Sequence, residues 1–295
     1  MRSMIKEKKE GKCMAAEKKI KVGTMLFKND EHPYFKKLKS GIEDKIRDAG
    51  AEGIFHECGF TIDSQVEALD GLIKKKCDAM IISPSEDHRV IEKVDEAAGK
   101  GIKIVTVDAD LPTSHRSCFV GVNPYQTGEI AAGIIGRLSE KKSEVCVVSG
   151  NRNFNSHKER TRGFREYLEK HFPGITVDAV IYCEDDDYKC YEEVQNVLAA
   201  FPMIRGLAFI AGGIYGGCKA LYQLTTSMDF NVVTIGEIDS TRDFMEKGVI
   251  DMTIVSNPYP IGRTAASAVL RLLKGEEVEE FIYMENAVKT KECLL

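Results

Sequence analysis

The chain of 295 residues is long enough to form two domains of ordinary size. Its hydrophobic content of 43% and charged content of 29% are typical of a soluble globular protein, and its net charge of −5 gives no reason to expect nucleic-acid binding. No apolar run approaches the ~18 residues that a membrane-spanning helix requires, so no membrane partner is expected.

The first residues and the cysteines bear on where the protein works. Residues 1–18 are polar and basic, and we expect a disordered tail that lacks the apolar stretch of a secretory signal. The nine cysteines are scattered, and none has the spacing of a metal site. An exported protein would risk mispairing so many thiols, which favours a reducing, cytoplasmic location.

Apolar strands alternate with helical patterns along the rest of the chain. The first strand, 20–27, precedes a helix whose apolar residues recur at three- and four-residue steps from Phe35 to Ala49. Further strands are expected at 79–83, 103–107, 145–149, 206–211 and 232–236, and further helices at 62–73, 126–138 and 261–272. Buried strands that alternate with helices indicate an α/β fold with parallel sheets and helices on both faces.

Ligands of such sheets bind beyond the carboxyl ends of the strands, so the loops that follow the strands are candidates for function. His32, Tyr34 and Phe35 follow the first strand, and an aromatic pair there can stack on the C–H face of a sugar ring. The alternative is that Phe35 is the first core residue of the helix and Tyr34 a surface aromatic.

Two carboxylates follow the strand 103–107. Asp108 and Asp110 can accept hydrogen bonds from ligand hydroxyls. A turn is the alternative, because Asp and the nearby Pro112 both favour turns. We favour a ligand role for Asp108 over Asp110.

Two later loops are also candidates. The loop 149–160 is dense in hydrogen-bond donors and includes Asn155 and Arg160, whose fork-shaped guanidinium can hold two ligand oxygens. The glycine-rich segment 211–217 could cradle a phosphate, but it matches neither GxGxxG nor the P-loop. Its small residues would equally let a ligand or another loop approach the backbone.

No catalytic set emerges from the sequence. There is no GxSxG elbow and no HExxH motif, and no cysteine and histidine form a recognisable pair. We therefore expect a protein without enzymatic activity, metal or cofactor.

Eight short stretches, each weak alone, occur in an order and spacing that resemble one family. They are 32–35, 61–65, 82–84, 105–108, 110–112, 120–128, 157–160 with 163–164, and 247–251. Together they resemble the type 1 periplasmic-binding-protein fold, specifically the effector domain of LacI-type transcriptional regulators and their sugar-binding relatives. The resemblance implies two Rossmann-like lobes joined by three hinge crossovers. One lobe would comprise 19–121 with 257–281, and the other 122–256 with 282–295.

The resemblance also implies a small ligand, usually a sugar, held between the lobes. His32, Tyr34 and Phe35 would supply polar and aromatic contacts from the first lobe. Asp108 would bind ligand hydroxyls, and Arg160 would clamp the ligand from the second lobe.

Three positions depart from the pattern of sugar binders. Gly212 stands where many of them carry an asparagine, and Ser256 occupies a common glutamine position. Gly236 stands where they carry an aspartate, for which Glu237 or Asp239 could substitute. These departures leave the aromatic and arginine half of the site intact and put a plain pentose or hexose specificity in doubt.

The favoured hypothesis is a ligand-sensing effector domain of a LacI-type regulator. It would be a cytoplasmic homodimer that reaches DNA only through a helix-turn-helix absent from this chain. The alternative is the solute-binding component of a sugar ABC importer, which would bind its ligand as a monomer.

Overall fold

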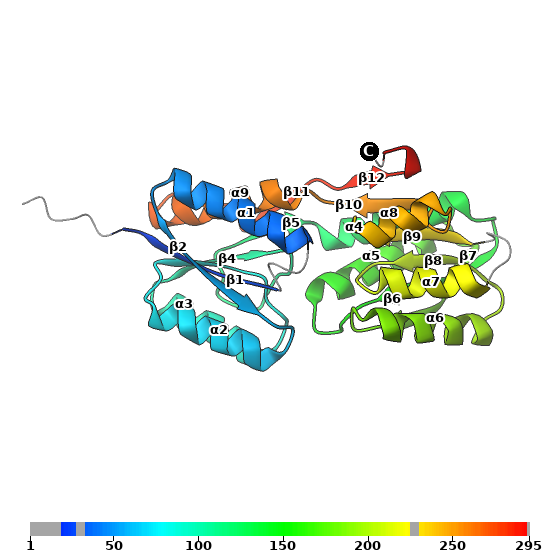
Figure 1. Cartoon of the computed structure of the whole chain (residues 1–295), viewed down its shortest axis with the longest axis horizontal. Coiled ribbons are helices and arrows are strands. Elements are labelled where there is room, and N and C mark those ends of the chain that lie inside the picture. Colours follow the sequence, from blue (N-terminus) through cyan, green and yellow to red (C-terminus); the bar gives the residue numbers. More distant parts are fainter. Residues whose placement is uncertain (1–18, 28–32, 225–229, 294–295) are drawn as a thin grey trace, which may run out of the picture.

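The computed structural model describes residues 19–27, 33–224 and 230–293, which form two α/β lobes side by side (Figure 1). Each lobe contains a six-stranded sheet with helices on both faces. Within the described residues, no helix is both long enough and apolar enough to cross a membrane.

The first lobe is built on a fully parallel sheet. Its strands, in spatial order, are β11 (Phe281–Met284), β5 (Cys118–Val122), β4 (Lys103–Val107), β3 (Ala79–Ile82), β1 (Lys21–Phe27) and β2 (Glu52–Cys58). Helices α1 (Pro33–Asp48) and α9 (Pro258–Leu273) cover one face, and α2 (Ile62–Lys74) and α3 (His88–Gly99) cover the other (Figure 1). The central strands are buried on both faces, which explains their continuous apolar sequences.

The second lobe repeats this arrangement with one antiparallel edge strand. Its strands, in spatial order, are β12 (Ala287–Lys289), β10 (Met252–Val255), β9 (Asn231–Ile235), β8 (Ile204–Phe209), β6 (Ser143–Ser149) and β7 (Ile175–Tyr182). The antiparallel strand is β12. Helices α4 (Pro124–Leu138) and α5 (Asn155–His171) share one core, whereas α6 (Asp187–Ala200), α7 (Ile214–Leu224) and α8 (Asp239–Glu246) share another. A short 3₁₀ helix, η1 (Lys291–Cys293), follows β12.

The chain passes between the lobes three times. The crossings run from β5 to α4, from β10 to α9, and from β11 to β12. The two α/β lobes with three crossovers agree with the sequence prediction. The third crossing lies after Met284 rather than at residue 281, because β11 pairs with β5 in the first sheet.

Helix α5 packs closely on α4 through two glycines. A Cβ on Gly128 would collide with the Arg160 carbonyl, and a Cβ on Gly163 would collide with the Tyr125 carbonyl. The absent side chains therefore allow a close approach that a larger residue would prevent. This contact fixes the first turns of α5, and with them Arg160, next to the crossing that precedes α4.

Candidate functional site

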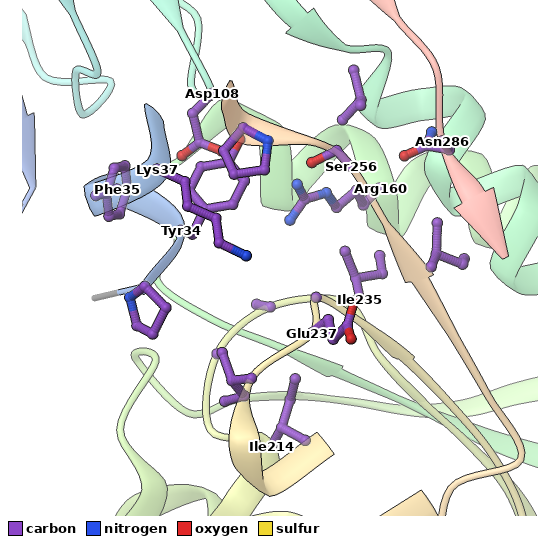
Figure 2. Close-up of a pocket in the computed structure, with 18 of the residues that line it drawn as sticks. Tyr34, Phe35, Lys37, Asp108, Arg160, Ile214, Ile235, Glu237, Ser256 and Asn286 are labelled. Carbon is purple, nitrogen blue, oxygen red and sulfur yellow. The ribbon is translucent and has the colours of Figure 1, made fainter. Parts of the chain in front are cut away.

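A cavity of about 270 Å³ lies between the two lobes, at the carboxyl ends of strands from both sheets (Figure 2). The cavity therefore occupies the place where ligands of open α/β sheets bind. Residues of the first lobe and the crossings that line it are Pro33, Tyr34, Phe35, Lys37, Asp108, Val122, Ser256, Pro258 and Asn286. Residues of the second lobe that line it are His157, Arg160, Ala211, Gly212, Ile214, Ile235, Gly236, Glu237, Ile238 and Ile254.

Asp108 has a strained backbone. Its φ is +64°, and the Ala109 N–H donates to the Val107 carbonyl oxygen across it at 2.7 Å. This is a three-residue turn with a non-glycine residue in the left-handed region, a conformation that costs about 1–3 kcal/mol. Residues held in such conformations cluster at binding sites, which supports a ligand role for this carboxylate.

The Tyr34 hydroxyl links two elements of the cavity. It hydrogen-bonds to Asp108 at the end of β4 and to Ser256 in the β10–α9 crossing. Burial raises the pKa of Tyr34 well above its usual value, and the nearby Asp108 charge raises it further. The tyrosine therefore remains a neutral hydroxyl that holds the Asp108 carboxylate in place.

Arg160, from the second lobe, places its positively charged guanidinium near Asp108. Its Nη1 donates to the Ile210 carbonyl oxygen at 3.0 Å, while its Nε is buried and has no hydrogen-bond partner among the described residues. Burial lowers the pKa of Arg160, and the charge of Asp108 opposes that effect. A guanidinium donor and a carboxylate acceptor thus face one cavity, an arrangement that suits a ligand rich in hydroxyls.

Glu237 is held ionised at another side of the cavity. One of its oxygens accepts from Arg242 and the other from Lys289, each at 2.6 Å. The hydrogen bond from Lys289, followed by that from Arg242, lowers the pKa of Glu237 against the opposing effect of burial.

In the glycine-rich segment 211–217, which runs into the first turn of α7, two of the amides are already bonded to carboxylates. The Gly212 N–H donates to Asp185 at 2.8 Å, and the Gly216 N–H donates to Asp187 at 3.1 Å. An anion in this place would meet two carboxylates, so the phosphate hypothesis has no support in the geometry.

Seven of the residues predicted from the sequence line the cavity: Tyr34, Phe35, Asp108, Arg160, Gly212, Glu237 and Ser256. His32 lies outside the described residues. Asp239 is not a lining residue, because it is the exposed first residue of α8.

Asp110 and Asn155 lie elsewhere. Asp110 accepts from the Arg116 Nε at 2.6 Å and from its Nη2 at 2.8 Å, and also from the Thr106 hydroxyl. This buried ion pair commits the carboxylate to the fold. Together with Asn155, Asp110 lines a second hollow, which shares Asp108 with the ligand cavity and also includes Phe281 and Tyr283.

Several lining residues were not predicted: Lys37, His157, Ile214, Ile235, Ile238 and Asn286. His157 belongs to the donor-rich loop, which was a usable signal. The isoleucines are indistinguishable from core residues in the sequence, and Asn286 reaches the cavity only because the third crossing passes beside it.

The described residues contain no group of three or more His, Cys, Asp or Glu side chains placed to hold a metal ion. Two lobes, three crossovers and an interlobe cavity with convergent polar groups define a class of receptor that binds a small molecule between its lobes. The sequence model of the periplasmic binding protein domain family matches residues 22–277, and the chain belongs to that family.

Three relatives illustrate the similarity. The ribose import binding protein RbsB of Bacillus subtilis is 24% identical over 263 residues, which cover 88% of this chain and 84% of the relative. The D-allose-binding periplasmic protein of Escherichia coli is 23% identical over 273 residues, which cover 86% of this chain and 85% of the relative. An ABC transporter solute-binding protein of Burkholderia graminis, solved with D-arabinose, superposes with a TM-score of 0.86 at 25% identity, covering 95% of this chain and 98% of that one.

These similarities correct the favoured functional hypothesis. The assignment to the effector domain of a LacI-type regulator is wrong, because the relatives are import and periplasmic binding proteins rather than regulators. They also give no support to the expected homodimer or to a role at DNA.

The cytoplasmic expectation is wrong for the same reason. Its physical basis was the risk of thiol mispairing. However, the seven cysteines from Cys58 to Cys218 are buried in the folded structure. Buried thiols act as small apolar side chains shielded from exchange, so their number does not report the compartment.

Proposed function

We propose that this chain is the solute-binding component of a sugar ABC importer and that it holds a small carbohydrate in the interlobe cavity. The observation that carries the proposal is the strained Asp108 carboxylate facing the Arg160 guanidinium across that cavity. The relatives named for ribose, D-allose and D-arabinose support a carbohydrate as the ligand class.

The two charged groups would divide the work of recognition. Asp108 accepts hydrogen bonds from ligand hydroxyls, and Arg160 donates to hydroxyl or ring oxygens, giving the charge-assisted hydrogen bonds that are stronger than neutral ones. Tyr34, which is itself hydrogen-bonded to Ser256, holds the carboxylate before the ligand arrives, so little ordering remains to be done on binding.

The dimensions of the cavity suit a small ligand. Its volume of about 270 Å³ lies just below the usual range of ligand pockets, which begins at about 300 Å³. Because its lining comes from both lobes, a ligand would favour the closed arrangement of the lobes, which is the form an importer would recognise.

Thermal unfolding with a panel of pentoses, hexoses and polyols at millimolar concentration tests the proposal. A sugar that binds only the folded chain must raise its melting temperature. We expect at least one carbohydrate to do so for the wild type, and the Arg160→Ala variant to lose the shift. The exposed Arg162, which pairs with Glu159 and Glu166, provides the matched control, and Arg162→Ala should retain the shift. If no carbohydrate shifts the wild-type transition, the sugar-binding role is refuted.

A further inference from the structure

The two sides of the cavity differ in chemistry (Figure 2). Asp108, Arg160 and Ser256 form a polar side. Away from Asp108, Figure 2 shows Ile235 and Ile214, with Glu237 beside Ile235. Ile214 at the start of α7 and Ile235 and Ile238 of the β9–α8 segment all line the cavity, and we name these three residues the isoleucine wall. A ligand in this cavity therefore meets hydrogen-bonding groups at Asp108, Arg160 and Ser256, and apolar carbon at the isoleucine wall around Glu237.

The two glycines that line the cavity beside the isoleucine wall, Gly212 and Gly236, already have hydrogen-bond partners among the described residues. The Gly236 N–H donates to the Ile254 carbonyl oxygen at 2.8 Å, and the Gly236 carbonyl accepts from the Thr253 hydroxyl at 2.9 Å. The Gly212 N–H is bonded to Asp185, as described above.

Few polar side chains lie beside the isoleucine wall. In the segments 211–214 and 235–238, Glu237 alone has a polar side chain. Each of its oxygens already accepts a hydrogen bond from a cation. Each Glu237 oxygen keeps one further acceptor site, but a ligand hydroxyl directed at the isoleucine side chains themselves would exchange water for hydrocarbon.

Ile238 is an unfavourable residue for its position at the start of α8. It occupies the N-cap position of α8, with φ −125° and ψ 170°, and makes no capping hydrogen bond. Serine, threonine, asparagine and aspartate are favoured at that position, because their side chains satisfy a free backbone N–H. A residue that weakens its own helix while lining a cavity is better explained by the cavity than by the helix.

We infer that the ligand of this site carries an apolar group, such as a deoxy carbon or a methyl substituent, that packs against the isoleucine wall. This rests on the proposed function, since it assumes that a sugar binds with its hydroxyls toward Asp108 and Arg160. The ligand class is then a deoxy sugar or a methyl glycoside rather than a fully hydroxylated sugar.

Calorimetric titration with matched pairs of sugars tests the inference. The pairs are D-galactose with D-fucose, L-mannose with L-rhamnose, D-ribose with 5-deoxy-D-ribose, and D-glucose with its methyl glycosides. In at least one pair the apolar member should bind about 10- to 100-fold more tightly, which is the effect of a buried hydroxyl left without a partner. If the hydroxylated member binds as tightly or more tightly in every pair that binds, the inference is wrong and the sugar-binding role stands. If no sugar binds, both fail.

A variant of Ile238 separates the cavity from the helix. Ile238→Asn places a favoured N-cap residue and an amide at the wall, so the fold should be retained while the preference for the apolar member falls at least tenfold. Ile238→Val keeps the wall apolar and should keep the preference. An unchanged preference in Ile238→Asn would show that the isoleucine wall does not contact the ligand.

Discussion

Asp108 combines a carboxylate that we propose binds the ligand with a strained backbone. Its carboxylate is linked to Tyr34 and lies in the field of Arg160, while its φ of +64° is one that L-residues disfavour. The sequence marked both Asp108 and Asp110 after the same strand. The two carboxylates differ because Asp110 forms a buried ion pair with Arg116, six residues later, and so has a structural role. The sequence does not show such a side-chain pairing.

Because the backbone of Asp108 is strained, a glycine at this position should give a more stable protein than an alanine. Asp108→Gly and Asp108→Ala both remove the carboxylate, so they differ mainly in the cost of a positive φ. We expect the glycine variant to be more stable to urea than the alanine variant by about 1 kcal/mol, because glycine adopts this region freely. Neither should bind sugar. Equal unfolding free energies would mean that the backbone here is not strained.

His157 should make stability depend on pH. Its pKa is lowered, chiefly because burial disfavours the imidazolium, while Asp185 partly opposes the effect. The unfolded chain therefore takes up the proton first, at its usual pKa of about 6.5, and the free energy of unfolding falls as pH decreases below that value until the lower folded pKa is reached.

Urea unfolding at pH 7.5 and pH 5.5 measures this contribution. His157→Gln should lose less stability between the two pH values than the wild type. His115→Gln serves as the control, because the His115 side chain is 80% exposed, and it should follow the wild type. A His157→Gln protein with the full wild-type pH dependence would contradict the assignment.

At the scale of elements, the segment that begins α5 connects the lobes at a second place. The Phe154 ring contacts Phe27 and Phe60 of the first lobe edge-on, at centroid distances of 5.5 and 6.4 Å. Beside it, Lys158 pairs with Glu86 at 2.7 Å, and the Glu86 N–H donates to the Asn153 carbonyl oxygen at 2.7 Å. We call Phe154 and the Lys158–Glu86 pair the interlobe latch.

The two parts of the interlobe latch should contribute unequally to ligand affinity. Phe154 does not line the ligand cavity, yet it is buried against rings of the first lobe, and burial of such a side chain contributes about 1.5–3 kcal/mol to this arrangement of the lobes. Phe154→Ala should therefore weaken sugar binding by roughly 10- to 150-fold. Lys158→Ala removes a partly exposed ion pair worth at most about 1 kcal/mol and should weaken binding less than about sixfold. Calorimetry on both variants checks this, and unchanged affinity in Phe154→Ala would show that closure does not depend on the latch.

The strands that are buried on both faces could be predicted from the sequence. The strand expected at 103–107 is β4, since a strand covered on both faces has an uninterrupted apolar sequence. The edge strands β2 and β7 are half-exposed along most of their length, so their sequences carry no such run. The isoleucine wall was missed because the sequence does not distinguish an isoleucine facing a cavity from one facing the core.

At the scale of the whole molecule, the sequence predicted the architecture but not its use. The alternation of strands and helices indicated parallel α/β sheets, and the family resemblance implied two lobes with three crossovers, an architecture expected equally of a regulator domain and an importer component. The cysteine count favoured the wrong compartment, because composition records how many thiols exist and not how deeply they are buried.

The central claim is that a sugar binds between the lobes and contacts both. Hydrogen exchange measured by mass spectrometry, with and without the sugar that gives the largest thermal shift, tests it most directly. We expect slower exchange in the strand-end segments 105–109 and 254–258 and also in 157–162, 210–214 and 235–238, which line the cavity from the crossings and from each lobe. Protection confined to one lobe, or found only away from these segments, would contradict the account.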